Sequence, residues 1–169
     1  MGLPPRCWAL AWAGGQALAR YCLDTPGVVT GKRVLDFAAG GAVSGIAAMK
    51  AGAASVLACE LDAFAIAAIE ANAAANSVTL DTRLGDLVGT DEGWDVILAG
   101  DVFYEDGPAR LIGGWLQTLA QRGATVLIGD PGRSFLPQDR LEKLAGYTVP
   151  VTRDLEDREV RYAKVWKFR

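Results

Sequence analysis

Residues 34–51 constrain the fold more than any other stretch of this chain. An apolar run at 34–37 is followed by small residues at 38–45 and by a helical pattern at 46–51. This order predicts a strand, a tight turn and a helix, an arrangement in which backbone N–H groups and a helix N terminus face a ligand. Gly40 and its small neighbours let that ligand approach the backbone closely. The stretch therefore predicts an α/β fold with a ligand site where the strand ends.

Asp36 indicates the charge of the ligand. It lies at the carboxyl end of the predicted strand, directly before the turn. A carboxylate at this place attracts a cationic group, such as the amino group of S-adenosylmethionine, and repels a pyrophosphate. Asp36 therefore favours a methyl-donor site.

A nicotinamide dinucleotide site is the alternative. Gly40, Ala42 and Gly45 nearly match the pattern GxGxxG, and Glu60 follows at the spacing of an acid that binds ribose hydroxyls. Both kinds of site use such an acid, so Glu60 does not distinguish them. The sequence has no histidine and no Tyr-x-x-x-Lys pair, which are the usual proton donors of nicotinamide dehydrogenases. This composition agrees with Asp36 in favouring the methyl donor.

Strand and helix patterns alternate along the chain. Strands are expected at 33–37, 55–59, 79–84, 94–99, 124–129, 147–152 and 160–168, and helices at 16–23, 44–51, 63–76, 108–121 and about 138–144. We expect residues 1–169 to form one doubly wound, Rossmann-like α/β domain. Its seven-stranded sheet is mostly parallel and ends in an antiparallel hairpin across the acidic turn 154–157. The expected buried face of helix 63–76 consists of Phe64, Ala67, Ala68 and Ala71.

An acidic residue stands at or just beyond the end of each of the first five predicted strands. These residues are Asp36, Glu60, Asp86, Asp101 and Asp130. Each one alone is also explained as a helix cap or turn residue, most simply Asp130, which precedes a proline. Ligands of such sheets bind beyond the carboxyl ends of the strands. Together the five acids predict a ligand with cationic centres and ribose hydroxyls.

Charge and composition exclude several functions and suggest a setting. The formal charge of −3 and the lack of a basic run argue against nucleic acid, and no apolar run is long enough for a membrane span. Without histidine, His-based zinc sites and Ser-His-Asp triads are excluded, and we expect no metal. Three cysteines without a CxxC pair and an N terminus without a secretory pattern predict a cytoplasmic protein. We expect it to be a monomer.

The motifs in their order resemble a known family. Trp-x-Gly-Gly at 12–15, Val-Leu-Asp-Phe-Ala-Ala-Gly at 34–40, Glu-Leu-Asp at 60–62, Gly-Asp-Leu at 85–87 and Asp-Val-Phe-Tyr at 101–104 look like those of seven-strand S-adenosylmethionine-dependent methyltransferases. More narrowly, the chain resembles the protein-lysine methyltransferases with Asp-x-x-Tyr after the fourth strand. Among these it is most similar to the family of electron-transfer flavoprotein beta-subunit lysine methyltransferases.

The resemblance implies a role for individual residues. Asp36 and the backbone of Ala38, Gly40 and Gly41 would hold the methionine end of the donor, and Glu60 its ribose. Asp86 and the Leu87 backbone would meet the adenine. Trp12, in the N-terminal segment 1–30, would line the donor pocket. Asp101 and Tyr104 would be the catalytic residues that face a lysine amine of a protein substrate.

The sequence is therefore compatible with three alternative functions. The first is methylation of a protein lysine, with the electron-transfer flavoprotein beta subunit as one candidate acceptor. A small-molecule amine N-methyltransferase is the second, because the loops that would select the acceptor have no fixed pattern. The third is a donor-binding domain with little activity, since Ala38 and Ala42 stand where many methyltransferases have glycine, and the chain begins at the tryptophan segment.

Overall fold

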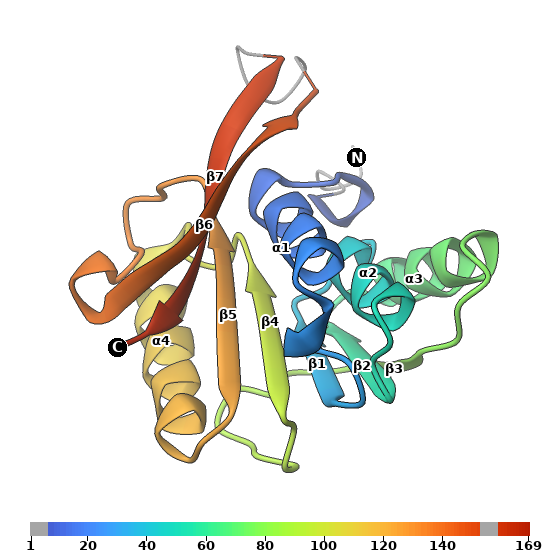
Figure 1. The fold of residues 1–169 in the computed structure, drawn as a ribbon, viewed down its shortest axis with the longest axis horizontal. Helices are drawn as coiled ribbons and strands as arrows, with labels where there is room; N and C mark the ends of the chain where they lie inside the picture. Colours follow the sequence, from blue (N-terminus) through green and yellow to red (C-terminus); the bar gives the residue numbers. More distant parts are fainter. Residues whose placement is uncertain (1–6, 153–158) are drawn as a thin grey trace, which may run out of the picture.

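The computed structural model describes residues 7–152 and 159–169, which form an α/β domain around one mixed sheet (Figure 1). The expected acidic turn 154–157 lies outside the described residues. The seven strands have the order β3-β2-β1-β4-β5-β7-β6. They are β1 (Arg33–Phe37), β2 (Ser55–Glu60), β3 (Asp81–Leu84), β4 (Val96–Gly100), β5 (Thr125–Asp130), β6 (Leu141–Pro150) and β7 (Val160–Phe168).

Strands β1 to β5 are parallel, and at one edge β7 is antiparallel to both of its neighbours, β5 and β6. Because β1 and β4 are neighbours in the centre, the strand order reverses between them. This is the switch point at which open α/β sheets bind their ligands. The expected doubly wound sheet with an antiparallel C-terminal hairpin is confirmed.

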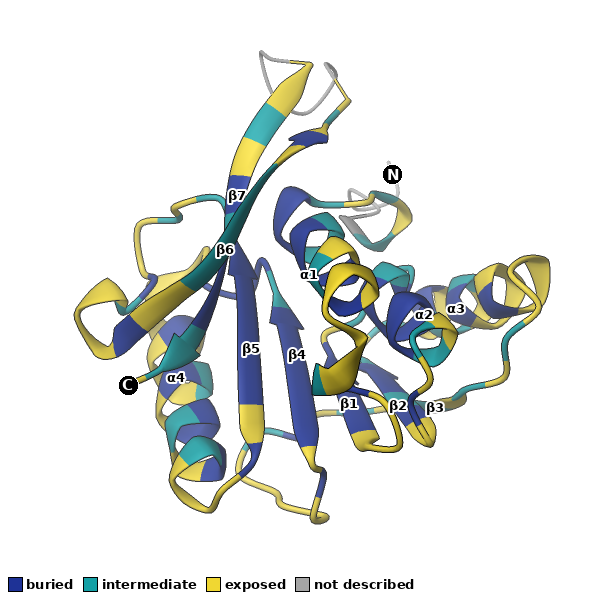
Figure 2. Ribbon diagram, in the orientation of Figure 1, coloured by how far each residue is buried: buried dark blue, intermediate teal, exposed yellow. Residues whose placement is uncertain are grey.

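Helices cover the two faces of the sheet unequally. Helix α1 (Ala13–Asp24) and α2 (Val43–Lys50) pack on the face that carries Val34, Val56 and Val96. Helix α3 (Ala63–Ala75) lies on the same face, beside β2 and β3. Helix α4 (Asp106–Gln121) covers β4 and β5 on the opposite face (Figure 2). Strand β4, which lies between the layers, is accordingly apolar and buried on both faces.

The expected helix at about 138–144 is wrong. A single 3-10 turn, Gln138–Arg140, leads directly into β6, which begins at Leu141 opposite Phe168 of β7. The mixed polar sequence of this segment also fits a helix, but pairing along the whole of β7 satisfies the backbone hydrogen-bonding groups of β6. Tertiary pairing here decides against local propensity.

The expected buried face of α3 is also wrong. Its buried residues are Ala65, Ile69 and Ala73, whereas Phe64 is 68% exposed. Alanine occurs on every side of this helix, so the sequence has almost no amphipathic pattern to reveal the buried face. The three buried residues are spaced four apart, and Ile69, the largest of them, determines which face of α3 packs on the sheet.

The apolar character of the chain does not extend to a membrane helix. Across residues 7–152 and 159–169, no helix combines the length and hydrophobicity needed to cross a bilayer.

Two glycines bring α1 into direct contact with the sheet. A Cβ atom on Gly14 would lie 2.1 Å from the backbone oxygen of Gly129 in β5 and 2.6 Å from Oδ2 of Asp101. A Cβ atom on Gly129 would meet the oxygen of Gly14 at 2.1 Å. Only glycine allows this approach, which explains the small residues at the start of α1.

We expect Gly14→Ala to lower the free energy of unfolding by about 2 kcal/mol or more, because the methyl group meets backbone that cannot move aside cheaply. Gly114→Ala is the matched control. Its site in the middle of α4 has nothing within 4 Å of the added Cβ, so helix propensity should make it neutral or stabilising by up to about 1 kcal/mol. Urea unfolding of both variants measures the difference. Equal stabilities would show that α1 can shift on the sheet.

Candidate active site

A cavity of about 450 Å³ opens at the carboxyl ends of β1 and β4. Its walls come from the segment 8–12 before α1, the turn 38–41 after β1 and the first residues of α2. Asp36 and Asp101 contribute carboxylates, and Ala68, Asn72 and Asn76 close the side towards α3. Six residues that the sequence placed in the site line this cavity: Trp12, Asp36, Ala38, Gly40, Gly41 and Asp101.

Asp36 is buried at the end of β1, and its Oδ2 accepts a hydrogen bond from the backbone N of Gly45 at 2.8 Å. Burial raises the pKa of this carboxyl to about 8, although the Gly45 bond opposes the shift. The negative charge of Glu60 adds to it. A cationic ligand in the cavity would supply the positive charge that stabilises the ionised form of Asp36.

Asp101 has a similar setting at the end of β4. Its Oδ2 accepts a hydrogen bond from the backbone N of Gly15 at 2.9 Å, and Arg133 Nη2 lies 3.1 Å from Oδ1. Burial raises the pKa of Asp101 to about 6, and the guanidinium of Arg133 limits that rise. The backbone of Asp101 has φ +59°, a left-handed conformation that costs a non-glycine residue about 1–2 kcal/mol. The surrounding structure thus holds the Asp101 side chain at the cavity although its backbone conformation is strained.

The two carboxylates cap the two helices that begin at the cavity. Gly15 and Gly45 are the third residues of α1 and α2, and the N-cap residue of neither helix provides a side-chain bond. A carboxylate from the neighbouring strand therefore satisfies the free N–H group and meets the positive end of the helix dipole. Ser44 Oγ also bonds the Gly15 carbonyl at 3.1 Å, which ties the two helix ends together.

The turn after β1 takes a left-handed backbone three times. Ala38, Gly40 and Ala42 have φ values of 51°, 57° and 61°. At Ala38 and Ala42 the side chain makes this conformation strained, whereas Gly40 adopts it freely. The alanines at positions 38 and 42, where many methyltransferases have glycine, therefore strain the turn.

Glu60 supports this turn. Its Oε1 accepts a hydrogen bond from the Gly40 backbone N at 2.6 Å, and its Oε2 accepts one from Leu61 N at 3.0 Å. Glu60 lies outside the cavity lining, at the end of β2 next to the turn. Its ribose-binding role stays a prediction.

Three further predicted residues lie away from the cavity lining. Asp86 is exposed and accepts a bond from Val88 N at 2.9 Å, while Leu87 is buried in the core. Tyr104 is 66% exposed, and among the described residues no hydrogen bond joins it to Asp101. Phe103 between them is fully buried. The adenine role of Asp86 and Leu87 and the catalytic role of Tyr104 stay predictions.

Sequence reasoning missed two contributors to the site. Asn72 of α3 donates from Nδ2 to the Gly41 carbonyl at 2.9 Å and so holds the turn from the opposite side. Arg133 reaches Asp101 from the loop after β5. The only sequence signal for either was the Asp-Pro-Gly-Arg run at 130–133, which follows a strand end.

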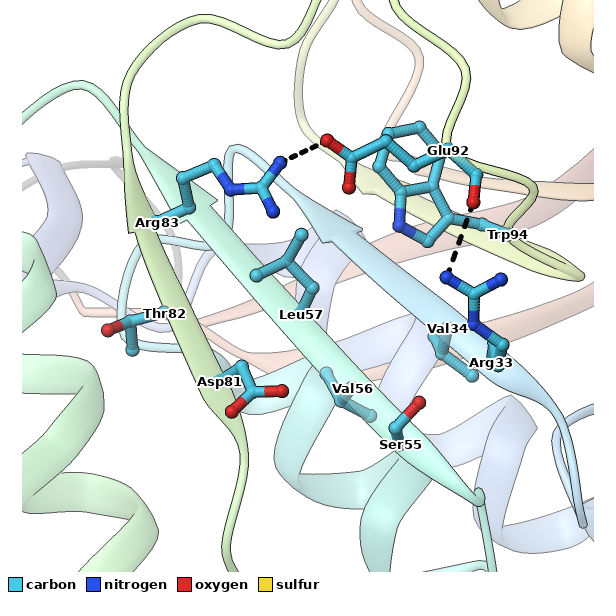
Figure 3. A pocket seen from close by; sticks show the side chains of 10 residues that line it. All are labelled: Arg33, Val34, Ser55, Val56, Leu57, Asp81, Thr82, Arg83, Glu92 and Trp94. Atoms are coloured by element: carbon cyan, nitrogen blue, oxygen red, sulfur yellow. Dashed lines mark hydrogen bonds and ion pairs between the residues drawn. The ribbon is translucent and has the colours of Figure 1, made fainter.

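A second hollow of about 370 Å³ lies near the opposite ends of the strands (Figure 3). Arg83 and Glu92 form an exposed ion pair across it, and Arg33 bonds the Glu92 carbonyl oxygen. Its lining includes Arg33, Ser55 and Asp81, the first residues of β1, β2 and β3, whereas ligands of parallel sheets bind at the carboxyl ends. The site is therefore the cavity between Asp36 and Asp101.

Comparison with known proteins relates the chain to methyltransferases. Residues 16–102 match the family model described as ribosomal protein L11 methyltransferase (PrmA). The electron transfer flavoprotein beta subunit lysine methyltransferase of Danio rerio is 38% identical over 172 residues, covering 98% of this chain and 67% of the relative. The chain thus spans about two thirds of that relative's length.

Solved structures show the same fold. The ribosomal protein L11 methylase of Lactobacillus delbrueckii subsp. bulgaricus aligns with a TM-score of 0.59 at 20% identity, over 91% of this chain and 79% of that one. The Pyrococcus abyssi tRNA (uracil-54, C5)-methyltransferase, solved with S-adenosyl-L-homocysteine, aligns with a TM-score of 0.60 at 17% identity, over 90% and 38%.

Fold, cavity and sequence together define an S-adenosylmethionine-dependent methyltransferase. The chain belongs to the family of the electron transfer flavoprotein beta subunit lysine methyltransferases. The residues present suit the methyl donor, because a cavity with two buried carboxylates, both of raised pKa, favours a ligand with cationic centres. Asp36 and the turn 38–41 are the residues that would hold it.

We expect S-adenosylmethionine to stabilise the protein against heat, by about 2.7 kcal/mol at 100 times its dissociation constant, and NADH to have no effect. In Asp36→Asn the charge that faces the donor is lost, so the stabilisation should shrink. The exposed Asp139→Asn is the control and should respond like the wild type. Thermal melts with each ligand test this, and stabilisation by NADH alone would reverse the donor assignment.

The raised pKa of Asp36 predicts how stability depends on pH without donor. The unfolded chain releases this proton near pH 4 and the folded protein near pH 8, so stability falls as pH rises between these values. Asp36→Asn removes this loss. At pH 8 it should be more stable than wild type by about 1.4 kcal/mol or more, with little difference at pH 4. Denaturant unfolding at both pH values measures it, and an equal effect at both would show that Asp36 is not protonated in the folded protein.

Proposed function

We propose that this enzyme transfers a methyl group from S-adenosylmethionine to the side-chain amine of a protein lysine. The electron transfer flavoprotein beta subunit is the first acceptor to test, because relatives at 38% identity are named for that substrate. The observation that carries the proposal is Asp101. It is a buried carboxylate at the cavity wall, fixed by the N terminus of α1, in the Asp-Val-Phe-Tyr run after β4.

The protein contributes mainly position and charge. When bound, S-adenosylmethionine supplies an electrophilic methyl group on a cationic sulfonium. Asp36 and Asp101 line the same cavity from adjacent strands, so the chain can hold a cationic donor near one carboxylate and an amine near the other. Holding two reactants in line removes much of the entropic cost of their encounter. The apolar segment 8–12 covers one side of the cavity and limits the access of water.

The acceptor must lose a proton before it can react. A free lysine amine has a pKa near 10.4, so deprotonating it at pH 7 costs roughly 4–5 kcal/mol. Asp101 attracts and orients the incoming ammonium, but a lone anion also raises the pKa of an amine. We therefore assign Asp101 an anchoring role, with the proton passing to water as the amine is desolvated. Tyr104 would contact the acceptor at the outer surface.

A small amine acceptor is the second candidate. The cavity itself does not distinguish a lysine side chain from a small amine, because both present the same group to Asp101. The family relationship favours the protein acceptor. Methylation of the purified flavoprotein subunit, followed by mass spectrometry of its lysines, decides between them. Methyl transfer to free amines alone would favour the second candidate, and donor binding without any transfer would leave a donor-binding domain.

Asp101→Asn tests the anchor. The substitution keeps the size of the side chain and an acceptor for Gly15 N–H but removes the charge. We expect single-turnover methylation to fall about tenfold or more, which corresponds to about 1.4 kcal/mol of transition-state stabilisation. Donor affinity should change little, since Asp36 is intact. Asp139→Asn, on the exposed turn before β6, should keep full activity. Equal rates for all three proteins would mean that Asp101 only caps α1.

A further inference from the structure

Arg133 is held against Asp101 by a chain of contacts from β5. Both oxygens of Asp101 have partners, Gly15 N on Oδ2 and Arg133 Nη2 on Oδ1. Asp130, fully buried at the end of β5, accepts bonds through Oδ1 from Gly132 N at 2.6 Å and Arg133 N at 2.7 Å. This turn aims the arginine across to the end of β4. The hydrogen bonds of this turn, and not an exposed ion pair, therefore fix the position of Arg133.

The arginine side chain is largely enclosed. It is 20% exposed, against 8% for Asp101, and its Nε is buried without a hydrogen-bond partner among the described residues. The guanidinium carbon lies 5.6 Å from the centre of a ring of Trp12, a residue of the cavity wall. Burying a guanidinium with an unsatisfied N–H costs free energy. That cost points to a role beyond anchoring the loop.

The charges around the pair define this role. The positive charge of Arg133 lowers the pKa of Asp101, and the negative charge of Asp130 raises it. Arg161 in turn lowers the pKa of Asp130. Asp36 lies in the same cavity as Asp101. Within residues 7–152 and 159–169, Arg133 is thus the cation in direct contact with Asp101. Without it, ionised Asp101 would present an uncompensated negative charge to the acceptor. Such a charge binds an ammonium firmly and keeps it protonated, which makes it a poor nucleophile.

We propose that Arg133 is a positioning residue that offsets the charge of Asp101, so that the acceptor amine gives up its proton in the site. This inference rests on the proposed amine methylation. The ammonium proton passes to water, and the freed nitrogen lone pair forms the N–C bond. The C–S bond breaks and its electron pair stays on the departing sulfur. Arg133 takes no part in these bond changes and acts only through Asp101.

The test compares Arg133→Met with Arg133→Lys. Met removes the charge at similar length, whereas Lys keeps it. With donor and acceptor both saturating, the pH dependence of the single-turnover rate reports the amine in the bound complex. In Arg133→Met we expect the rising limb to move about one pH unit upward, so that the rate at a fixed pH on this limb falls about tenfold. Arg133→Lys should restore a profile close to that of the wild type.

A donor-free measurement provides the second readout. Arg133 lowers the pKa of Asp101, so its charge stabilises the folded protein only at pH values at which Asp101 is ionised. Arg133→Met should therefore lower the melting temperature more at pH 8 than at pH 5. In the Asp101→Asn background this difference between the two pH values should disappear. A pH-independent fall in rate, or a melting difference that persists without Asp101, would overturn the role of Arg133 while leaving the proposed function intact. If wild type methylates no amine, the proposed function fails and this inference with it.

Discussion

The site depends on two buried carboxylates, each of which holds the N terminus of a helix from the adjacent layer. Asp36 binds the third N–H group of α2, and Asp101 binds that of α1. The N-cap residue of neither helix provides a side-chain bond, so removing a carboxylate would leave a buried or partly buried N–H donor unsatisfied. The same bonds fix the acids at the cavity. Structural and functional requirements on these residues therefore coincide.

Glycine makes this arrangement possible. The helices approach the strand ends so closely that a Cβ atom on Gly14 or Gly45 would lie within 3 Å of a carboxylate oxygen. The backbone of α1 also touches β5 directly at Gly129. Small residues near the start of α1 and α2 thus serve packing as much as ligand access. The strained left-handed residues Ala38, Ala42 and Asp101 lie where the chain turns around the cavity, as is common at binding sites.

Charge balance links the site to the rest of the sheet. Ionising two carboxylates in a buried site is unfavourable until a cation is present, which suits the cationic methyl donor on the side of Asp36. On the side of Asp101 the protein supplies its own cation, Arg133, from the end of β5. We propose on this basis that the two halves of one cavity have different tasks, one attracting a permanent cation and the other receiving an amine that must become neutral.

The sequence by itself predicted most of the sheet and six of the residues that line the cavity. The apolar run before Asp36 and the small residues after it predicted β1, the turn and α2, because strand period, glycine and helix start are local signals. Only the tertiary structure decided the rest. The buried face of α3 and the extent of β6 depended on which partners were in reach, since their own patterns were ambiguous. The pairing of Arg133 with Asp101 joins residues 32 positions apart, and no local pattern encodes a contact that arises where two strands end side by side.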